Sequence, residues 1–245
     1  NLLRSKTNSY PNLLPSAKRF PLIIYMAGLN GMGFENFKIL ERLAERGFIV
    51  VSVWSVGRYP GNMTSHKLDM MEQVYDAEFA LSYLKSQDEL VVDLNSIGVL
   101  GYSWGGMGAA VLLNRNPSMT AFASLDGSET NYFGNSDEDD LYIQEIYTSN
   151  LLDPENRSVD YLYLESGNKI SEYSPTGEYQ YYNKLNSREK YYLRFLNAKH
   201  ADFTCIPSIL QESQSAIATH DHILDVAVSF FQKRLQGIDG FNLIY

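Results

Sequence analysis

The sequence has little of what metal sites, disulfides and membrane spans require. It holds one cysteine, Cys205, and four histidines in 245 residues. A single cysteine cannot form an internal disulfide, and no CxxC or Cys/His spacing indicates a structural zinc. No apolar run approaches the roughly 20 residues of a membrane-spanning helix. We therefore expect no metal and no membrane span.

Positive charge is also scarce. The chain carries 20 basic and 29 acidic residues, for a net charge of -9, and no cluster of Lys and Arg. Because nucleic-acid binding depends on a basic patch, this composition excludes a nucleic-acid partner. With 44% hydrophobic residues, the chain is long enough for one sizeable core, and we expect a single domain over residues 1–245.

The beginning of the chain carries few structural signals. Residues 1–21 mix Ser and Asn with turn signals such as Tyr10-Pro11, which predicts an extended, loop-like entry. A start at Asn1 rather than Met fits either a shortened chain or an exported protein whose leader was removed. Export, to a periplasm or the cell exterior, is our expectation.

Short apolar runs alternate with segments of helical spacing along most of the chain. The runs are 22–26, 48–53, 97–100, 121–125, 161–164 and 191–196. Helical spacing is expected near 35–46, 68–87, 105–116 and 219–236. Strands that alternate with helices predict an α/β fold with a mostly parallel central sheet and helices on both faces.

Two segments interrupt this alternation. Residues 130–158 are acidic and rich in Tyr and Asn, and we predict a lid-like insertion there. Its acidic run, 137–140, is interpreted as a solvated loop, which would disfavour anionic substrates if it overhung the site. The second segment, 169–190, contains tyrosines that either stack on a substrate or belong to the core or a dimer surface. These tyrosines include Tyr173, Tyr179, Tyr181 and Tyr182.

The run Gly101-Tyr102-Ser103-Trp104-Gly105 lies between an expected strand and an expected helix. A GxSxG run is weak evidence alone, but in this context it predicts a tight turn that projects a serine hydroxyl above the sheet. The glycines permit the close approach of strand and helix. Ser103 is therefore the candidate nucleophile.

A serine nucleophile needs a base, which is usually a histidine oriented by a carboxylate. His200 follows the last expected strand, at the sheet edge where open α/β sheets place their ligands, so we favour it. His66 precedes the nucleophile, whereas triads of this kind run in the order Ser, acid, His. His220 and His222 are expected in the solvated first turn of the last helix.

Two carboxylates compete for the role of the acid. Asp126 ends the fourth expected strand and is followed by Gly127, which exposes its side chain at the same edge. Glu165 lies at the end of the fifth expected strand. Asp126 is favoured, and Glu165 stays open as the alternative.

Acyl transfer also needs N–H donors for the oxyanion, usually one after the nucleophile and one after an early strand. Trp104 supplies the first backbone N–H. The run Ala27-Gly28-Leu29-Asn30-Gly31 follows the first expected strand, and the N–H of Leu29 is the second candidate.

These runs resemble the α/β-hydrolase superfamily, and within it the dienelactone-hydrolase-like and platelet-activating-factor acetylhydrolase-like serine esterases. The resemblance covers most of the chain and places the acid at Asp126, in Ser124-Leu125-Asp126. It places the histidine at His200, before the pair Asp202-Phe203, and the oxyanion leucine at Leu29. Departures are Ala27, where relatives often have His, and a serine where dienelactone hydrolases use cysteine.

The sequence therefore predicts a serine hydrolase that cleaves a small-molecule carboxylic ester through an acyl-enzyme and needs no cofactor. An acyltransferase or peptidase would use the same triad. A non-catalytic binding protein on the same fold is the alternative from another class. The oligomeric state is left open.

Overall fold

The computed structural model describes residues 6–12, 14, 16–59, 61–87, 91–131, 137–167, 180–210 and 213–241. Tyr173 and Tyr179, two of the tyrosines considered as substrate contacts, lie outside the described residues.

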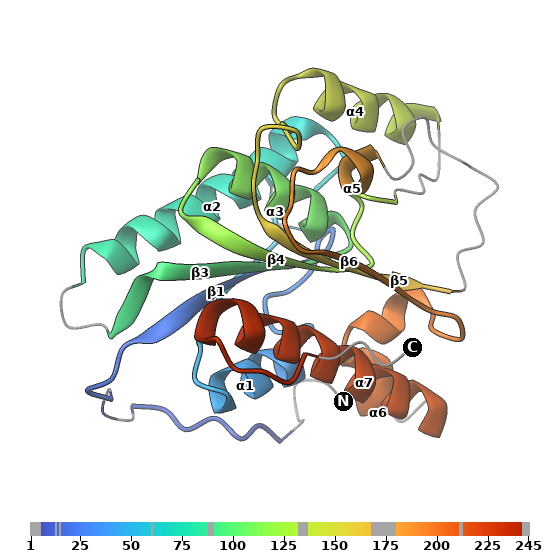
Figure 1. The fold of residues 1–245 in the computed structure, drawn as a ribbon. Helices are drawn as coiled ribbons and strands as arrows, with labels where there is room; N and C mark the ends of the chain where they lie inside the picture. Colours follow the sequence, from blue (N-terminus) through green and yellow to red (C-terminus); the bar gives the residue numbers. More distant parts are fainter. Residues whose placement is uncertain are drawn as a thin grey trace.

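A single six-stranded sheet runs through the molecule in the order β2-β1-β3-β4-β5-β6 (Figure 1). Every neighbouring pair in it is parallel. The strands are β1 (Phe20–Met26), β2 (Ile49–Val53), β3 (Val92–Tyr102), β4 (Met119–Leu125), β5 (Asp160–Ser166) and β6 (Lys190–Phe195). All six expected strands are confirmed, and β3 begins earlier than expected because residues before Ile97 also pair with β1.

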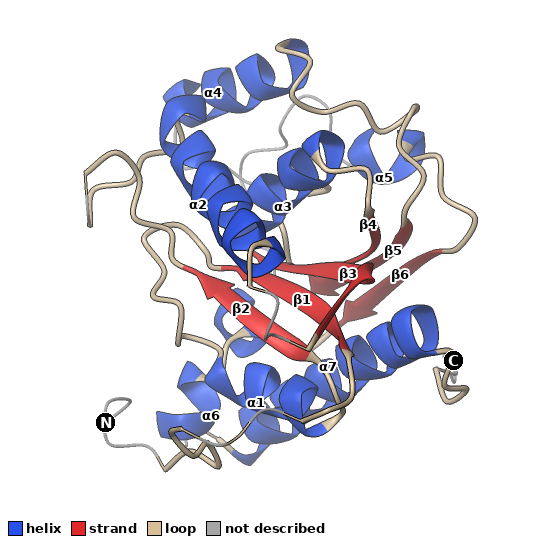
Figure 2. Ribbon diagram, turned by 90° about the vertical axis from the view of Figure 1, so that its left-hand side faces the viewer, coloured by secondary structure: helices blue, strands red, loops and turns tan. Residues whose placement is uncertain are grey.

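Helices cover both faces of this sheet (Figures 1 and 2). They are α1 (Phe37–Glu45), α2 (Lys67–Lys85), α3 (Trp104–Arg115), α4 (Asp137–Thr148), α5 (Gln180–Lys184), α6 (Ile206–Leu210) and α7 (Gln214–Phe231). One face carries α2 to α5, and the other carries α1, α6 and α7 (Figure 1). None of the helices in the described part of the chain has the length and apolar character that crossing a bilayer requires.

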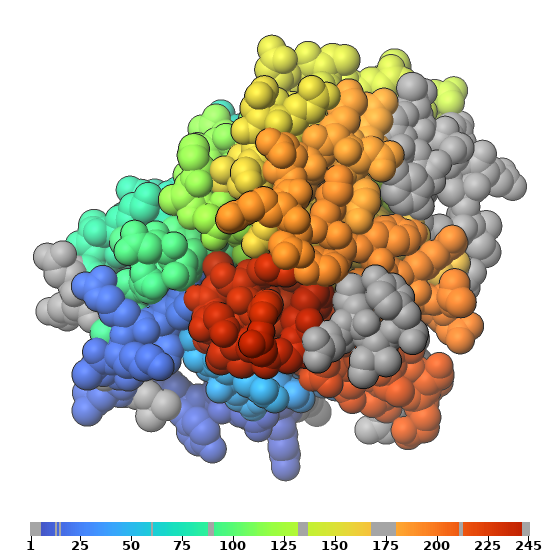
Figure 3. Space-filling model, in the orientation of Figure 1, coloured from blue at the N-terminus to red at the C-terminus, as the bar shows by residue number. Residues whose placement is uncertain are grey.

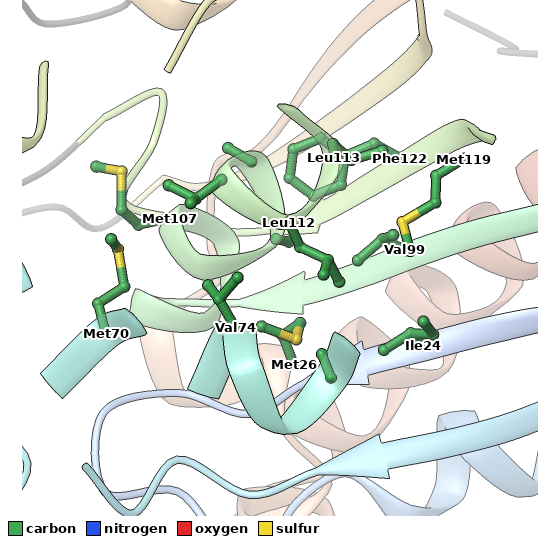
Figure 4. Packing of buried hydrophobic residues seen from close by; sticks show 14 of the residues in the cluster. Ile24, Met26, Met70, Val74, Val99, Met107, Leu112, Leu113, Met119 and Phe122 are labelled. Atoms are coloured by element: carbon green, nitrogen blue, oxygen red, sulfur yellow. The ribbon is translucent and has the colours of Figure 1, made fainter. Parts of the chain in front are cut away.

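The core lies in two layers, one on each face of the sheet. Ile23 and Tyr25 of β1 pack with α1 and α7, whereas Ile24 and Met26 pack with α2 and α3. Figure 4 shows part of the second layer, where Met26 and Val74 lie close to the residues of α3. Because both faces of β1 are buried, its sequence is a continuous apolar run rather than an alternating one.

The structure corrects two expectations about local structure. The acidic run 137–140 is the first turn of α4 rather than a loop, and negative charge near a helix N-terminus is stabilising. The last helix begins at Gln214, where the Ser213 hydroxyl accepts a hydrogen bond from Ala216 N at 3.0 Å. His220 is therefore in the interior of α7 and buried, not in a solvated first turn.

The register of the strands brings their carboxyl ends together. Met26 pairs with Gly101, Tyr102 with Leu125, and Leu125 with Leu164. Parallel strands that end in register place the loops after them at one edge of the sheet. The segments that follow β1, β3, β4 and β5 are therefore neighbours.

Helix α3 approaches β1 unusually closely at Gly105. A Cβ atom at this position would overlap the carbonyl oxygens of Met26 and Ala27. At Gly108, in the same helix, a Cβ would meet only the flexible ends of the Gln73 and Met26 side chains, at 3.2 Å. The absence of a side chain at Gly105 thus sets how closely helix and strand pack.

We expect Gly105→Ala to lower the free energy of unfolding by about 1–3 kcal/mol, because backbone atoms must move to accommodate the methyl group. Gly108→Ala is the matched control, with a much smaller expected effect. Urea denaturation followed by circular dichroism measures both. Equal stability of the two variants would contradict the packing argument.

Candidate active site

The turn between β3 and α3 holds Ser103 in a strained conformation. Its φ of 53° and ψ of -123° lie where residues with a Cβ are rarely found. The backbone is held there by hydrogen bonds from Ser103 N to Leu125 O, at 3.0 Å, and from Gly106 N and Ser128 N to Ser103 O. This conformation is what a GxSxG turn between strand and helix predicts.

The Ser103 hydroxyl lies beside the ring of His200, and the ring lies beside Asp126. Ser103 Oγ is 2.9 Å from His200 Nε2, and His200 Nδ1 is 2.6 Å from Asp126 Oδ2. A neutral ring with its proton on Nδ1 satisfies both contacts, since Nδ1–H donates to the carboxylate and Nε2 accepts from the hydroxyl. The structure thus brings the three residues together in the order that base catalysis by histidine requires.

Asp126 is held by β5 through its backbone and its side chain. Its backbone N–H donates to Leu164 O at 2.7 Å, and its Oδ1 accepts a hydrogen bond from Ser166 N at 2.8 Å. Its φ is 51°, and its side chain is fully buried. A buried carboxylate is tolerated when its oxygens are hydrogen-bonded, so the end of β5 stabilises the Asp126 carboxylate after β4.

Tyr102 supports the histidine. Its ring stacks on the His200 ring with centroids 5.0 Å apart, and its hydroxyl donates to His200 O at 3.3 Å. Burial raises the pKa of Tyr102, so it stays a neutral donor. Tyr102, the residue before Ser103, thereby fixes the orientation of the His200 ring.

The rival acid points elsewhere. Glu165 is fully buried, and its Oε1 accepts a hydrogen bond from Asn131 Nδ2 at 2.5 Å. Its Oε2 accepts from the Tyr192 hydroxyl and lies 3.5 Å from Arg194 Nε. Of the two candidates, Asp126 is the one whose carboxylate contacts His200.

The other histidines lie in different surroundings. His66 caps α2, because its Nδ1 accepts a hydrogen bond from Leu68 N at 3.1 Å. His222 contacts the ring of Phe195 edge-on. His220 is buried, and its Nδ1 lies 3.1 Å from Asp202 O, two residues after His200.

The loop after β1 lies against the serine turn. A Cβ at Gly28 would be 3.0 Å from the Tyr102 ring and 3.3 Å from Ser103 Cβ. The buried carboxylate of Glu35 holds this loop, since its Oε1 accepts hydrogen bonds from Gly28 N and the Tyr25 hydroxyl, both at 2.9 Å. Burial raises the pKa of Glu35, and these two donors oppose that rise.

A cavity of about 490 Å³ opens over Ser103 and His200. Leu29 and Trp104, the oxyanion candidates, line it. Its wall also includes Thr64 and Ser65 from the segment before α2, and residues of α4. Sites for small molecules have volumes in this range.

Reasoning from the sequence missed three supporting residues: Tyr102, Glu35 and Ser166. Tyr102 belongs to the GxSxG run, but nothing in the sequence indicates that its ring stacks on His200. The Glu35 carboxylate accepts from the backbone N–H of Gly28, and the backbone N–H of Ser166 donates to Asp126. Both contacts depend on the folded arrangement of the chain, which the sequence does not display. Within the described ranges, no three His, Cys, Asp or Glu side chains are grouped so that they could hold a metal ion.

Comparison with known proteins supports the fold. No protein-family model matches the chain, and no curated protein sequence matches it. Among solved structures, the chain is similar to a ferulic acid esterase from Streptomyces cinnamoneus, with a TM-score of 0.69 and 19% sequence identity. The match covers 92% of this chain and 70% of the esterase. The chain has an α/β-hydrolase fold.

His220 makes the stability of this region depend on pH. Burial lowers its pKa from 6.5, although the Asp202 carbonyl opposes this shift. Below pH 6.5 the unfolded chain therefore binds more protons than the folded chain, and the free energy of unfolding falls as the pH falls.

We expect His220→Asn, which keeps an N–H donor but cannot titrate, to remove this part of the pH dependence. The slope of the free energy of unfolding between about pH 7 and pH 5 should decrease by up to about 1.4 kcal/mol per pH unit. Urea denaturation at several pH values measures it, with the wild type as reference. Equal slopes for the wild type and His220→Asn would contradict a contribution of His220 to the pH dependence.

Proposed function

We propose that the protein is a serine hydrolase that cleaves a carboxylic ester through an acyl-enzyme on Ser103. The observation that carries this proposal is the continuous contact from Ser103 Oγ through the His200 ring to the buried Asp126 carboxylate. A serine hydroxyl is a poor nucleophile unless a base takes its proton, and the distance of 2.9 Å between Ser103 Oγ and His200 Nε2 supports His200 as that base.

In the first half of the reaction, His200 Nε2 takes the hydroxyl proton while Ser103 Oγ attacks the ester carbonyl carbon. The negative charge of Asp126 stabilises the imidazolium that forms. The tetrahedral intermediate then collapses, the bond to the alcohol oxygen breaks, and the imidazolium gives its proton to the leaving alcohol. The acyl group stays on Ser103.

In the second half, water repeats the attack with His200 as its base, and the acid is released. The backbone N–H groups of Leu29 and Trp104 are the proposed donors to the oxyanion of both intermediates. Their place in the cavity wall, beside Ser103, supports this assignment. These steps need no cofactor.

The ester class is supported by the ferulic acid esterase that shares the fold. Acyl transfer to another acceptor and peptide cleavage would use the same residues. Among these substrate classes we favour esters, because the structural neighbour is an esterase and because an alcohol leaves more readily than an amine.

We expect Ser103→Ala and His200→Ala to reduce kcat/KM for p-nitrophenyl acetate by about 10³-fold or more, and Asp126→Asn by about 10³–10⁴-fold. Glu165→Gln is the control for a buried carboxylate at the same sheet edge, with a loss expected below about tenfold. Each variant is checked for folding by circular dichroism. A fluorophosphonate probe should label the wild type and not Ser103→Ala.

Absence of hydrolysis and of labelling in the folded wild type would favour a non-catalytic binding protein. A larger loss from Glu165→Gln than from Asp126→Asn would move the acid to Glu165.

Variants of Glu35 test whether the loop after β1, which carries the proposed oxyanion donor Leu29, must be held in place for catalysis. Glu35→Ala removes the acceptor for Gly28 N, and we expect kcat to fall about tenfold with little change in KM, because the oxyanion forms only during the reaction. Glu35→Gln keeps an oxygen acceptor and should retain most of the activity. A fall confined to KM, or an equal loss in both variants, would argue against this positioning role.

A further inference from the structure

The peptide group between Ala27 and Gly28 is held at both ends by buried side chains. Its carbonyl oxygen, Ala27 O, accepts a hydrogen bond from Gln73 Nε2 of α2 at 2.9 Å. Its N–H, on Gly28, donates to Glu35 Oε1 at 2.9 Å. Because a peptide group is planar, two hydrogen bonds at its opposite ends leave it little freedom to rotate. The plane of this peptide is therefore fixed.

The neighbouring backbone groups of the same loop are also hydrogen-bonded. Ala27 N donates to Val53 O at 3.2 Å, and Gly28 O accepts from Gly31 N at 2.7 Å. The next donor along the chain is the N–H of Leu29, and within the described part of the chain it donates to no protein acceptor. Leu29 lines the cavity of the candidate active site. Its N–H is thus available to a molecule bound there.

Gln73 is a polar residue in an apolar place. The outer face of α2 is visible at the molecular surface in Figure 3, whereas Gln73 lies on the inner face and is 1% exposed. Its buried neighbours on α2 belong to the apolar core, namely Met70, Val74 and Ala77. Burying an amide costs free energy unless it is hydrogen-bonded, and Gln73 Oε1 has no partner among the described residues. An apolar side chain would avoid this cost, so the bond to Ala27 O is what distinguishes Gln73 from its neighbours.

We propose that Gln73 is a positioning residue for the oxyanion: it fixes the peptide before Gly28 and thereby directs the Leu29 N–H into the cavity. The inference rests on the proposed ester hydrolysis and on Leu29 as an oxyanion donor. Gln73 belongs to α2, on one face of the sheet, and Glu35 precedes α1, on the other face, so both helical layers hold the same peptide. An oxyanion forms only during the reaction, so a displaced donor lowers kcat and leaves KM nearly unchanged.

The first test removes the donor and keeps the length of the side chain. Gln73→Met has no N–H to offer Ala27 O. We expect kcat for p-nitrophenyl acetate to fall about tenfold, which is less than the roughly 10²–10³-fold loss of an oxyanion donor itself, with KM within about twofold. Titration to completion with the fluorophosphonate probe gives kcat per active enzyme, so that a loss of stability does not enter. A wild-type kcat in Gln73→Met would overturn the inference.

The second test restores the donor by protonation. Gln73→Glu keeps the shape of the side chain, but an ionised carboxylate can only accept, whereas a protonated carboxyl can donate to Ala27 O. Burial favours the protonated form, so we expect the ratio of its kcat to that of the wild type to be low near about pH 8.5 and to rise severalfold by about pH 5.5. The ratio cancels the titration of His200, which both enzymes share. A ratio that is equally low at both pH values contradicts the proposed role.

The control for the added carboxylate is Gln87→Glu. It is the same substitution just beyond the end of α2, where Gln87 Nε2 donates to Ser86 Oγ at the surface. Its kcat relative to the wild type should stay near one over the same pH range. A rise like that of Gln73→Glu would assign the effect to net charge and overturn the inference.

A double variant tests whether Gln73 and Glu35 act on the same peptide. When each single substitution already frees this peptide, the second adds little. We therefore expect Gln73→Met/Glu35→Ala to lose kcat within about threefold of the larger single loss, rather than the roughly 100-fold product of two independent losses. Multiplied losses would show that the two residues act separately, against the inference.

The proposed function and this inference fail in different ways. If the folded wild type does not hydrolyse p-nitrophenyl acetate and the fluorophosphonate probe does not label Ser103, the proposed function is wrong. If the wild type hydrolyses this ester and Gln73→Met does so with the same kcat, the inference is overturned and the proposed function stands.

Discussion

The close packing of α3 against β1 at Gly105 is the constraint on which the arrangement around Ser103 depends. Because no side chain separates this glycine from the carbonyls of Met26 and Ala27, the helix starts directly above the sheet. The chain must then reverse within the turn that holds Ser103, whose φ of 53° is the result. The buried apolar layers on both faces of the sheet offset the free-energy cost of this strained conformation.

The parallel sheet supplies the other half of the geometry. Ser103 follows β3, Asp126 follows β4 and His200 follows β6, so strands far apart in sequence each contribute one group at the same edge. Burial of Asp126 is tolerable because Ser166 N and His200 both bond to it. The end of β5 therefore contributes to the site through its backbone rather than through the Glu165 side chain.

Much of this was predictable because it depends on short-range patterns. The six strands follow from apolar runs, and the place of Ser103 follows from glycines between a strand and a helix. The start of α7 was missed because Ser213 caps it ahead of the apolar stripe, and α4 was missed because its acidic first turn is hydrophilic. Glu35 could not be found, since its role depends on a tertiary contact with Gly28.

The acidic turn of α4 joins a structural and a chemical effect in the same residues. Carboxylates at 137–140 favour the helix, because they lie beside the positive end of its dipole. The same turn places Glu138 and Asp139 in the wall of the cavity over Ser103. The contacts among Ser103, His200 and Asp126 are made by side chains that follow β3, β6 and β4, so substitutions in this turn can alter the cavity wall without removing any of the three contacting groups. Substrate preference can thus vary on α4 while the strained turn and its support stay the same.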